Sequence, residues 1–230
     1  NFSFRNTTNF LNNKFILDTS ANYIIQNDKN MVSQGQYFNP LTSLYLFPRG
    51  EDFSDVAVYE RYDDLSGVNT QYWPYGDLGG VSSQNPYWIM NRMNRENDRR
   101  RYKLAASLQY NIIEGLNVQG RVSIDNTESK YTEKFHAGTV GNFAGPKGRY
   151  KEENRLDRQV YADVLANFNK TFNEFNVTAN LGASIKDLRM ELTSLHGDLN
   201  NVTNHFTIEN LTRSGYYKVN ADGLKRQTQS

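Results

Sequence analysis

Apolar and polar residues alternate along five stretches of the chain. In residues 14–26, every second side chain belongs to one mainly apolar row: Phe15, Leu17, Thr19, Ala21, Tyr23 and Ile25. The alternation recurs at residues 102–112, 116–125, 160–169 and 175–186, and more weakly at 2–11. Successive side chains of a strand point to opposite faces, whereas a helix groups residues three and four apart. The pattern therefore predicts strands with one apolar and one polar face.

The connections between these stretches alternate between short and long. Hairpin-sized links lie at Asn12–Asn13, Glu114–Gly115 and Thr171–Glu174, and long loops are expected at about 27–97, 127–157 and 187–225. All the long loops then lie at one end of the sheet, which is typical of an outer-membrane barrel. We predict an all-β fold: an antiparallel meander of hairpins from a transmembrane β-barrel, with long extracellular loops carrying short helices. One partial barrel domain would cover residues 1–230, with about six strands and the start of a seventh.

Aromatic residues near both ends of the strands favour the barrel over a soluble sandwich. Phe15, Tyr110, Phe168, Phe172 and Phe175 lie toward the short turns, and Tyr23 and Tyr102 lie toward the long loops. Aromatic girdles mark the two membrane–water interfaces of a barrel. Aromatic residues also favour strands in general. A soluble all-β ligand-binding domain with large recognition loops therefore remains the alternative.

Composition excludes several other classes of protein. The chain has 230 residues, a net charge of +1, a mean hydropathy of −0.74 and no cysteine. No disulfide or thiolate metal site can form, and the charge gives no general attraction to nucleic acid. No apolar stretch has the roughly 20 residues of a membrane helix, which a barrel does not need. Both ends read as parts of strands, so we expect a segment of a larger barrel.

Segments of the first long loop carry a family resemblance. They are Gly35–Leu41, Tyr45–Phe53 (YLFPRGEDF) and Gln84–Trp88 (QNPYW), followed by the Arg-rich entry to a strand and by Leu116–Asp125. In this order they resemble the SusC/RagA-type TonB-dependent outer-membrane transporters of Bacteroidetes.

The resemblance implies a location in a Gram-negative outer membrane and the import of large nutrients such as oligosaccharides or peptides. It also implies a SusD-like surface lipoprotein as partner, beside the outer-membrane lipid. TonB would act only through a plug domain and a TonB box outside these 230 residues. The implied role is not enzymatic.

Aromatic side chains in the first long loop are the candidate substrate- or partner-binding residues, because their faces stack on sugar rings and peptide side chains. We select Trp73, Tyr75, Tyr87 and Trp88. The competing interpretation is a small core that holds the long loop together. Trp73 and Tyr75 lie among prolines and glycines, so we expect these two at the surface.

Local signals predict short helices in this loop. Asn39-Pro40 and Asn85-Pro86 are turn or helix-start signals, and a helix from Phe53 to Tyr62 would begin at Ser54 as N-cap. The acidic residues around Glu51 match no calcium-binding loop.

The basic run from Arg92 to Lys103 would either contact lipopolysaccharide phosphate or pair with nearby carboxylates. His136, His196 and His205 lack ligand spacing, and we predict no cofactor, metal or catalytic residue. On the polar face, one set of charged residues would line a barrel lumen: Asp18, Arg121, Asp125, Asp163 and Lys186.

Overall fold

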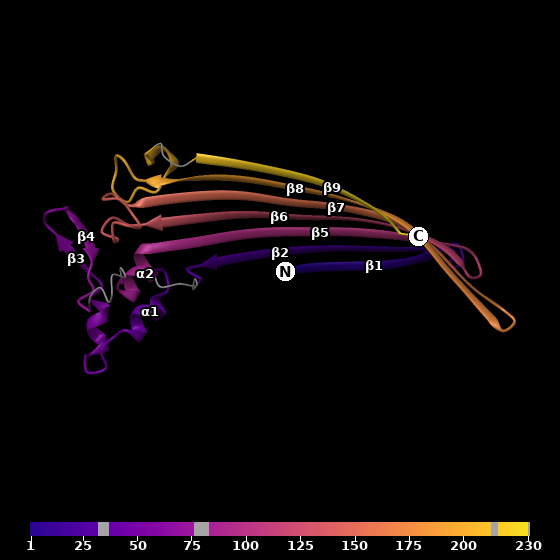
Figure 1. Ribbon diagram of the computed structural model, residues 1–230, viewed down its shortest axis with the longest axis horizontal. Coiled ribbons are helices and arrows are strands. Elements are labelled where there is room, and N and C mark those ends of the chain that lie inside the picture. Colours follow the sequence, from indigo (N-terminus) through magenta and orange to yellow (C-terminus); the bar gives the residue numbers. More distant parts are fainter. Residues whose placement is uncertain (32–36, 76–82, 213–215, 230) are drawn as a thin grey trace.

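The computed structural model describes residues 1–31, 37–75 and 83–212, and the backbone of 216–229. Seven strands form one antiparallel sheet in which each strand pairs with its neighbour in the order β1-β2-β5-β6-β7-β8-β9 (Figure 1). They are β1 Phe2–Phe10, β2 Phe15–Lys29, β5 Met93–Ile113, β6 Leu116–Phe135, β7 Arg149–Phe172, β8 Phe175–Asp198 and β9 Tyr216–Gln229. The predicted all-β meander of hairpins is confirmed.

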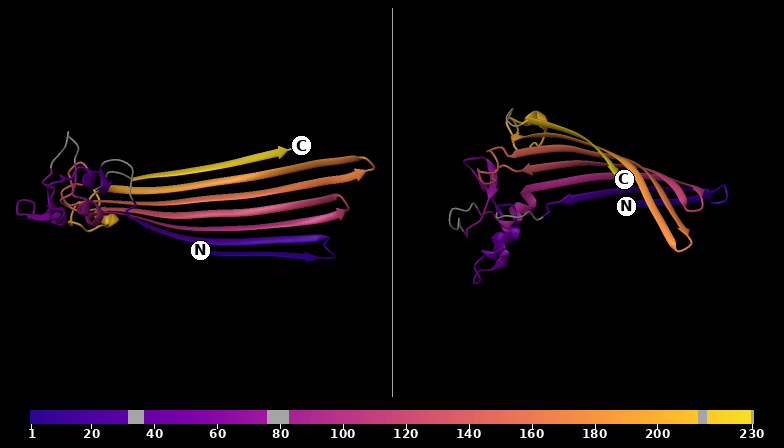
Figure 2. Two further views of the ribbon diagram at one scale, coloured as in Figure 1. Left: turned by 90° about the horizontal axis from the view of Figure 1, so that it is seen from below. Right: turned by 45° about the vertical axis from the view of Figure 1, so that its right-hand side comes forward.

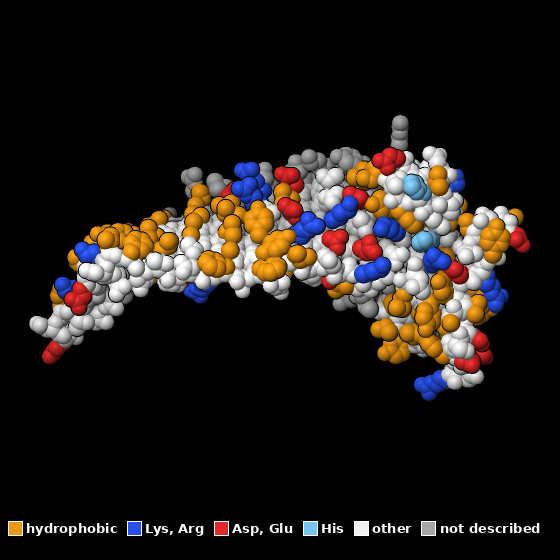
Figure 3. Space-filling model, turned by 180° about the vertical axis from the view of Figure 1, so that it is seen from behind, with side chains coloured by type: hydrophobic (Ala, Val, Ile, Leu, Met, Phe, Trp, Pro, Cys, Tyr) orange, Lys and Arg blue, Asp and Glu red, His pale blue; other side chains and the backbone are white. Residues whose placement is uncertain are grey.

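The strand register keeps one face apolar across the sheet. One row of paired residues, called here the reference row, runs Phe15–Tyr110–Val118–Ala166–Leu181 from β2 to β8. Alternate residues on either side of this row form the apolar face, and the residues between them form the polar face. Figure 3 shows hydrophobic side chains gathered over the strands and charged side chains nearer the loops.

The apolar segments are staggered from strand to strand. Each covers eleven residues on β2 (15–25) and on β8 (175–185), but the β8 segment is displaced by six residues toward the short turns. From β2 to β8 the last apolar residue before the loops approaches the reference row, with Ile124 and Val160 at the same level: Ile25, Tyr102, Ile124, Val160 and Ile185. Figure 2 shows the hairpin ends stepping outward in the same direction. The apolar band therefore crosses the strands obliquely.

The strands are longer than their apolar segments. β6 continues to Phe135, β7 begins at Arg149 and β8 continues to Asp198, so the predicted loop bounds of 127–157 and 187–225 were too wide. Beyond the apolar band the strands are mainly polar, although β8 carries Leu188, Met190 and Leu192 on the face opposite to its band. Cross-strand ion pairs such as Lys130–Glu152 at 3.5 Å accompany the backbone ladder there. The apolar band ends, whereas the backbone pairing continues.

The first loop carries most of the remaining elements: α1 Pro40–Tyr45, η1 Phe53–Ala57, β3 Glu60–Asp63, β4 Val68–Gln71 and α2 Pro86–Arg92. The third loop carries the short η2 Ile208–Asn210. Asn39 and Asn85 cap α1 and α2, each with proline in the first turn, which confirms these two signals. The helix predicted from Phe53 to Tyr62 is only the short η1, and Asp52 caps it in place of Ser54. The chain turns into β3 shortly after, so a longer helix does not form. None of the helices in the described residues has the length and apolar composition that a membrane-crossing helix requires.

Candidate functional site

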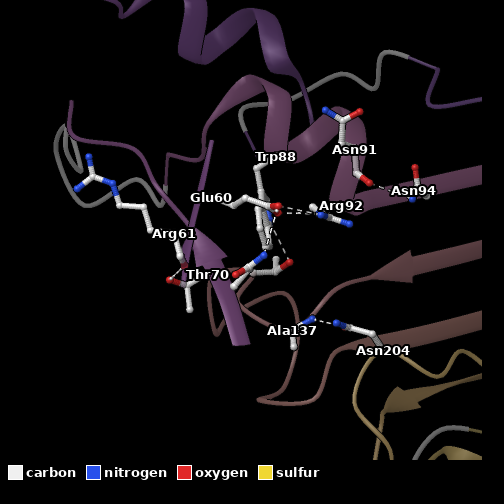
Figure 4. Close-up of polar contacts among 11 residues, drawn as sticks. Glu60, Arg61, Thr70, Trp88, Asn91, Arg92, Asn94, Ala137 and Asn204 are labelled. Carbon is white, nitrogen blue, oxygen red and sulfur yellow. Dashed lines mark hydrogen bonds and ion pairs between the residues drawn. The ribbon is translucent and has the colours of Figure 1, made fainter. Parts of the chain in front are cut away.

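The loop assembly, defined as the described parts of residues 30–92, 136–148 and 199–212, has its own small core. Trp88, Ile89, Met93, Phe135 and Ala144 are buried together, with Phe38, Tyr59 and Phe143 packed against them. Trp88 is only 1% exposed, and its Nε1 donates to Thr139 Oγ1 at 3.1 Å, from the first loop to the second. Figure 4 shows the Trp88 indole between the helices and the strand ends. Trp88 therefore holds two loops together.

Asn85 is a second structural centre of the loop assembly. It is buried, and its Oδ1 accepts the Tyr87 N–H at 2.9 Å as the N-cap of α2. Its Nδ2 donates to the backbone carbonyls of Val56 at 2.9 Å and Tyr72 at 3.1 Å. Buried polar groups must find such partners to be tolerated. One asparagine side chain thus ties α2 to η1 and to the residues after β4.

A bidentate ion pair joins β3 to the end of α2. Arg92 donates to the two carboxylate oxygens of Glu60 at 2.8 and 2.9 Å (Figure 4). These hydrogen bonds from Arg92 hold the pKa of Glu60 below its usual range. Burial, with a smaller contribution from the Arg92 charge, lowers the pKa of His136, so this imidazole favours its neutral form. The pair joins the β3–β4 hairpin to the end of α2.

The third loop is attached to the second by side-chain to backbone contacts. Asn204 Oδ1 accepts the Ala137 N–H at 2.7 Å (Figure 4). Lys147 Nζ donates to the carbonyls of Asn200 at 2.6 Å and Asn201 at 3.2 Å. The three loops therefore form one connected body at the end of the sheet.

The structure places the four predicted binding residues in three different environments. Trp73 and Tyr75 form an edge-to-face pair with ring centroids 5.1 Å apart. Tyr87 stacks on Tyr59 at 6.4 Å, and Trp88 lies in the core described above. Trp73, Tyr75 and Tyr87 are half-buried. Trp73 and Tyr75 thus contact each other and are half-buried rather than fully at the surface, whereas Tyr87 and Trp88 belong to the packing of α2.

Two further rings extend the Trp73–Tyr75 pair. Phe47 meets Tyr75 edge-on at 4.9 Å and Phe53 at 5.5 Å. We call Phe47, Phe53, Trp73 and Tyr75 the aromatic patch. Phe53 is exposed, so the patch reaches the surface. Phe47 and Phe53 are not among the four residues selected from the sequence. The aromatic content of the segment Tyr45–Phe53 was the signal that could have found them.

The polar face carries arginine–carboxylate pairs at intervals across the sheet. Arg5 pairs with Asp18 at 2.7 Å, and Arg121 pairs with Asp163 at 2.9 Å. Arg101 Nε donates to Asp125 Oδ1 at 2.8 Å. All of the charged residues predicted for the lumen-facing side lie on this polar face, with Lys186 placed there by its register with Tyr161.

The basic run at the start of β5 is divided between different partners. Arg92 pairs with Glu60, Arg101 pairs with Asp125, and Arg95 donates to the Phe38 carbonyl at 3.2 Å. Alternation along the strand then places Arg99 on the polar face and Arg100 on the apolar-face side. Pairing with carboxylates thus accounts for part of the run, and a contact of Arg100 with lipid phosphate stays a prediction. Within the described residues, no three His, Asp or Glu side chains are grouped to hold a metal ion.

Comparison with known proteins gives a fold and no sequence family. No protein-family model and no curated protein sequence matches the chain. Among solved structures, it is similar to the RagAB peptide transporter, with a TM-score of 0.64 and 12% identity over 97% of this chain. The RagAB peptide importer matches at a TM-score of 0.63 and 12% identity in its "closed-closed" state, and at 0.61 and 13% in its "open-open" state.

At this identity the similarity concerns the fold alone. This chain spans about a quarter of the length of the chains it matches, since it covers 24% of each. The hairpin meander and its loop end are therefore the arrangement found in part of a peptide transporter.

Proposed function

We propose that this chain forms barrel wall and extracellular loops of a SusC/RagA-type TonB-dependent transporter in the outer membrane. The observation that carries this proposal is the oblique apolar band. Across four strand spacings, about 19 Å, the band shifts by six residues, about 20 Å. The strands would then tilt by about 45° from the membrane normal, near the 35–45° of outer-membrane barrels.

The length of the apolar segments supports the same placement. Eleven residues span about 33 Å along a strand, which is about 23 Å along the membrane normal at that tilt. The lipid-facing band of an outer-membrane barrel is about 25 Å tall. The tilt comes from the register alone, the height combines that tilt with the segment length, and both values agree with a bilayer.

The exposed apolar face argues against the soluble alternative. Leu181 and Val164 are 61% and 56% exposed in the middle of that face. In the part of the chain that the structure describes, the only other sheet is the β3–β4 hairpin of the loop assembly. A soluble sandwich would need a second sheet against these side chains. Lipid is the solvent that suits them.

The role of this segment is to form wall and binding surface, without chemistry of its own. The RagAB proteins are described as peptide transporters, which favours peptides over oligosaccharides as cargo here. The aromatic patch supplies stacking surfaces for cargo or for a SusD-like lipoprotein, because half-buried rings are held in place before a partner arrives. Tyr87 and Trp88 would act indirectly, by fixing the loop that presents Trp73 and Tyr75.

Extraction of the full-length protein tests the proposed placement. Membranes from expressing cells are washed with alkaline carbonate and then treated with detergent. We expect the protein to stay in the washed membranes and to appear in solution only with detergent. Release by the carbonate wash as a folded, monomeric protein would contradict the barrel and favour the soluble all-β domain.

A further inference from the structure

A hollow of about 490 Å³ lies on the polar face, where a row of small side chains crosses the sheet. The row is Ser20–Ala105–Ser123, with Arg5 beyond one end and Tyr161 beyond the other. Small residues on three neighbouring strands leave room that longer neighbours enclose. The register of the strands thus builds this hollow, and all of its described lining residues lie on strands.

Three cations line the hollow, and two of them are already paired. Arg5 is held by Asp18, and Arg121 is held by Asp163, whose side chain is almost fully buried. Each of these pairs is close to neutral, and each fixes a guanidinium at the rim. The charge of the hollow is therefore set by the third cation, Lys103.

Lys103 is left without a carboxylate of its own. Its cross-strand partner by register is Asp125, but Arg101 binds both oxygens of that carboxylate. Among the described residues, no side chain makes a hydrogen bond or ion pair with the Lys103 ammonium. A lysine in this position has three donors available for a ligand.

We infer that this hollow binds a carboxylate group of the transported peptide. One unpaired ammonium matches one negative charge, and hydroxyl and amide groups around it can donate to the second carboxylate oxygen. These groups are Ser20, Ser107, Ser123 and Gln119. The inference rests on the proposed function, because it assumes that peptides pass along the polar face. It adds a preference for acidic cargo that the proposed function does not contain.

The test compares two peptides that differ by one Glu→Gln substitution, binding to the full-length transporter in detergent by calorimetry. We expect the acidic peptide to bind more tightly to the unmodified protein. Lys103→Gln should weaken its binding roughly tenfold and leave the Gln peptide within about twofold. Ala105→Leu, which fills the floor and keeps every charge, should also weaken binding of the acidic peptide.

Lys130→Gln is the matched control, since it removes the same charge from the opposite face of the adjacent strand, where Lys130 pairs with Glu152. It should leave both affinities unchanged. Equal binding of the two peptides, unchanged by Lys103→Gln, would overturn the site and leave the transport function standing. If Lys103→Gln lowers the unfolding temperature of the ligand-free protein without changing either affinity, the carboxylate comes from the transporter itself, and the assignment to cargo fails. If the unmodified transporter binds neither peptide, the proposed peptide import fails together with the site.

Discussion

The middle of the sheet and the loop assembly are stabilised by different means. In the middle, backbone pairing and a mainly apolar face repeat from strand to strand, and no single side chain is indispensable. In the loop assembly, a few buried groups such as Trp88 and Asn85 each join two or more segments. The stability of the sheet therefore depends on the solvent around its apolar face, whereas the stability of the loop assembly depends on individual contacts.

The largest effect is expected from Trp88→Ala. Removing the indole opens a cavity among Ile89, Met93 and Phe135 and leaves the Thr139 hydroxyl without its donor. We expect the loop assembly to lose about 3–5 kcal/mol of stability. Hydrogen exchange of the loop amides in the full-length protein measures this loss. Trp73→Ala, at a half-buried position outside the core cluster, is the control and should change the exchange rates far less.

A charge on the apolar face should have the next largest effect. Leu108 lies near the middle of the β5 apolar segment, and its neighbour Ser107 lies on the polar face. Leu108→Arg should destabilise the protein folded in lipid bilayers by about 2–4 kcal/mol. Ser107→Arg carries the same charge and should change it far less. Equal effects of the two substitutions would contradict the assignment of one face to lipid and the other to water.

The aromatic patch is expected to contribute to binding rather than to stability. Trp73→Ala combined with Tyr75→Ala removes both rings of the edge-to-face pair. We expect a loss of about 1–2 kcal/mol in binding of peptide or of the partner lipoprotein, measured by titration. The unfolding temperature should stay close to that of the unmodified protein. An unchanged affinity would show that the patch only packs the loop.

The smallest effect concerns pH. The folded-state pKa of Glu60 is lowered by Arg92, so the pair stabilises the loop assembly above the ordinary pKa of glutamate. This stabilisation, up to about 1 kcal/mol for a partly exposed pair, should disappear as the pH falls through the lowered pKa. Hydrogen exchange followed from about pH 6 down to about pH 3 should show the loss. Glu60→Gln should remove it, whereas Glu51→Gln, at an exposed position, should not.

The sequence predicts the middle of the sheet well, because alternation is a local signal that needs no knowledge of partners. It does not predict the strand ends. Lys130 and Glu152 are far apart in the chain, and only the strand pairing brings them together on one face. The same limit applies to the stagger of the apolar segments, which becomes visible only once the register aligns the strands.

The candidate site is predicted in part for a similar reason. Asn39-Pro40 and Asn85-Pro86 are local capping signals, and both are found at helix starts. The role of Trp88 depends on Thr139, in another loop, and no spacing in the sequence announces that bond. In the sequence, Lys103 is likewise only one member of a basic run. The strand register shows that its cross-strand neighbour Asp125 is bound by Arg101 instead.

The claim on which the proposed function rests is that the apolar face contacts lipid. The chain has no cysteine, so Val122→Cys and Ser123→Cys each give one spin-label site in this segment, on opposite faces of β6. In the full-length protein in bilayers, we predict that the Val122 label is relaxed by oxygen and not by a water-soluble nickel complex. The Ser123 label should show the reverse preference. A Val122 label that is immobilised and reached by neither reagent would place this face in a dry protein core and contradict the membrane barrel.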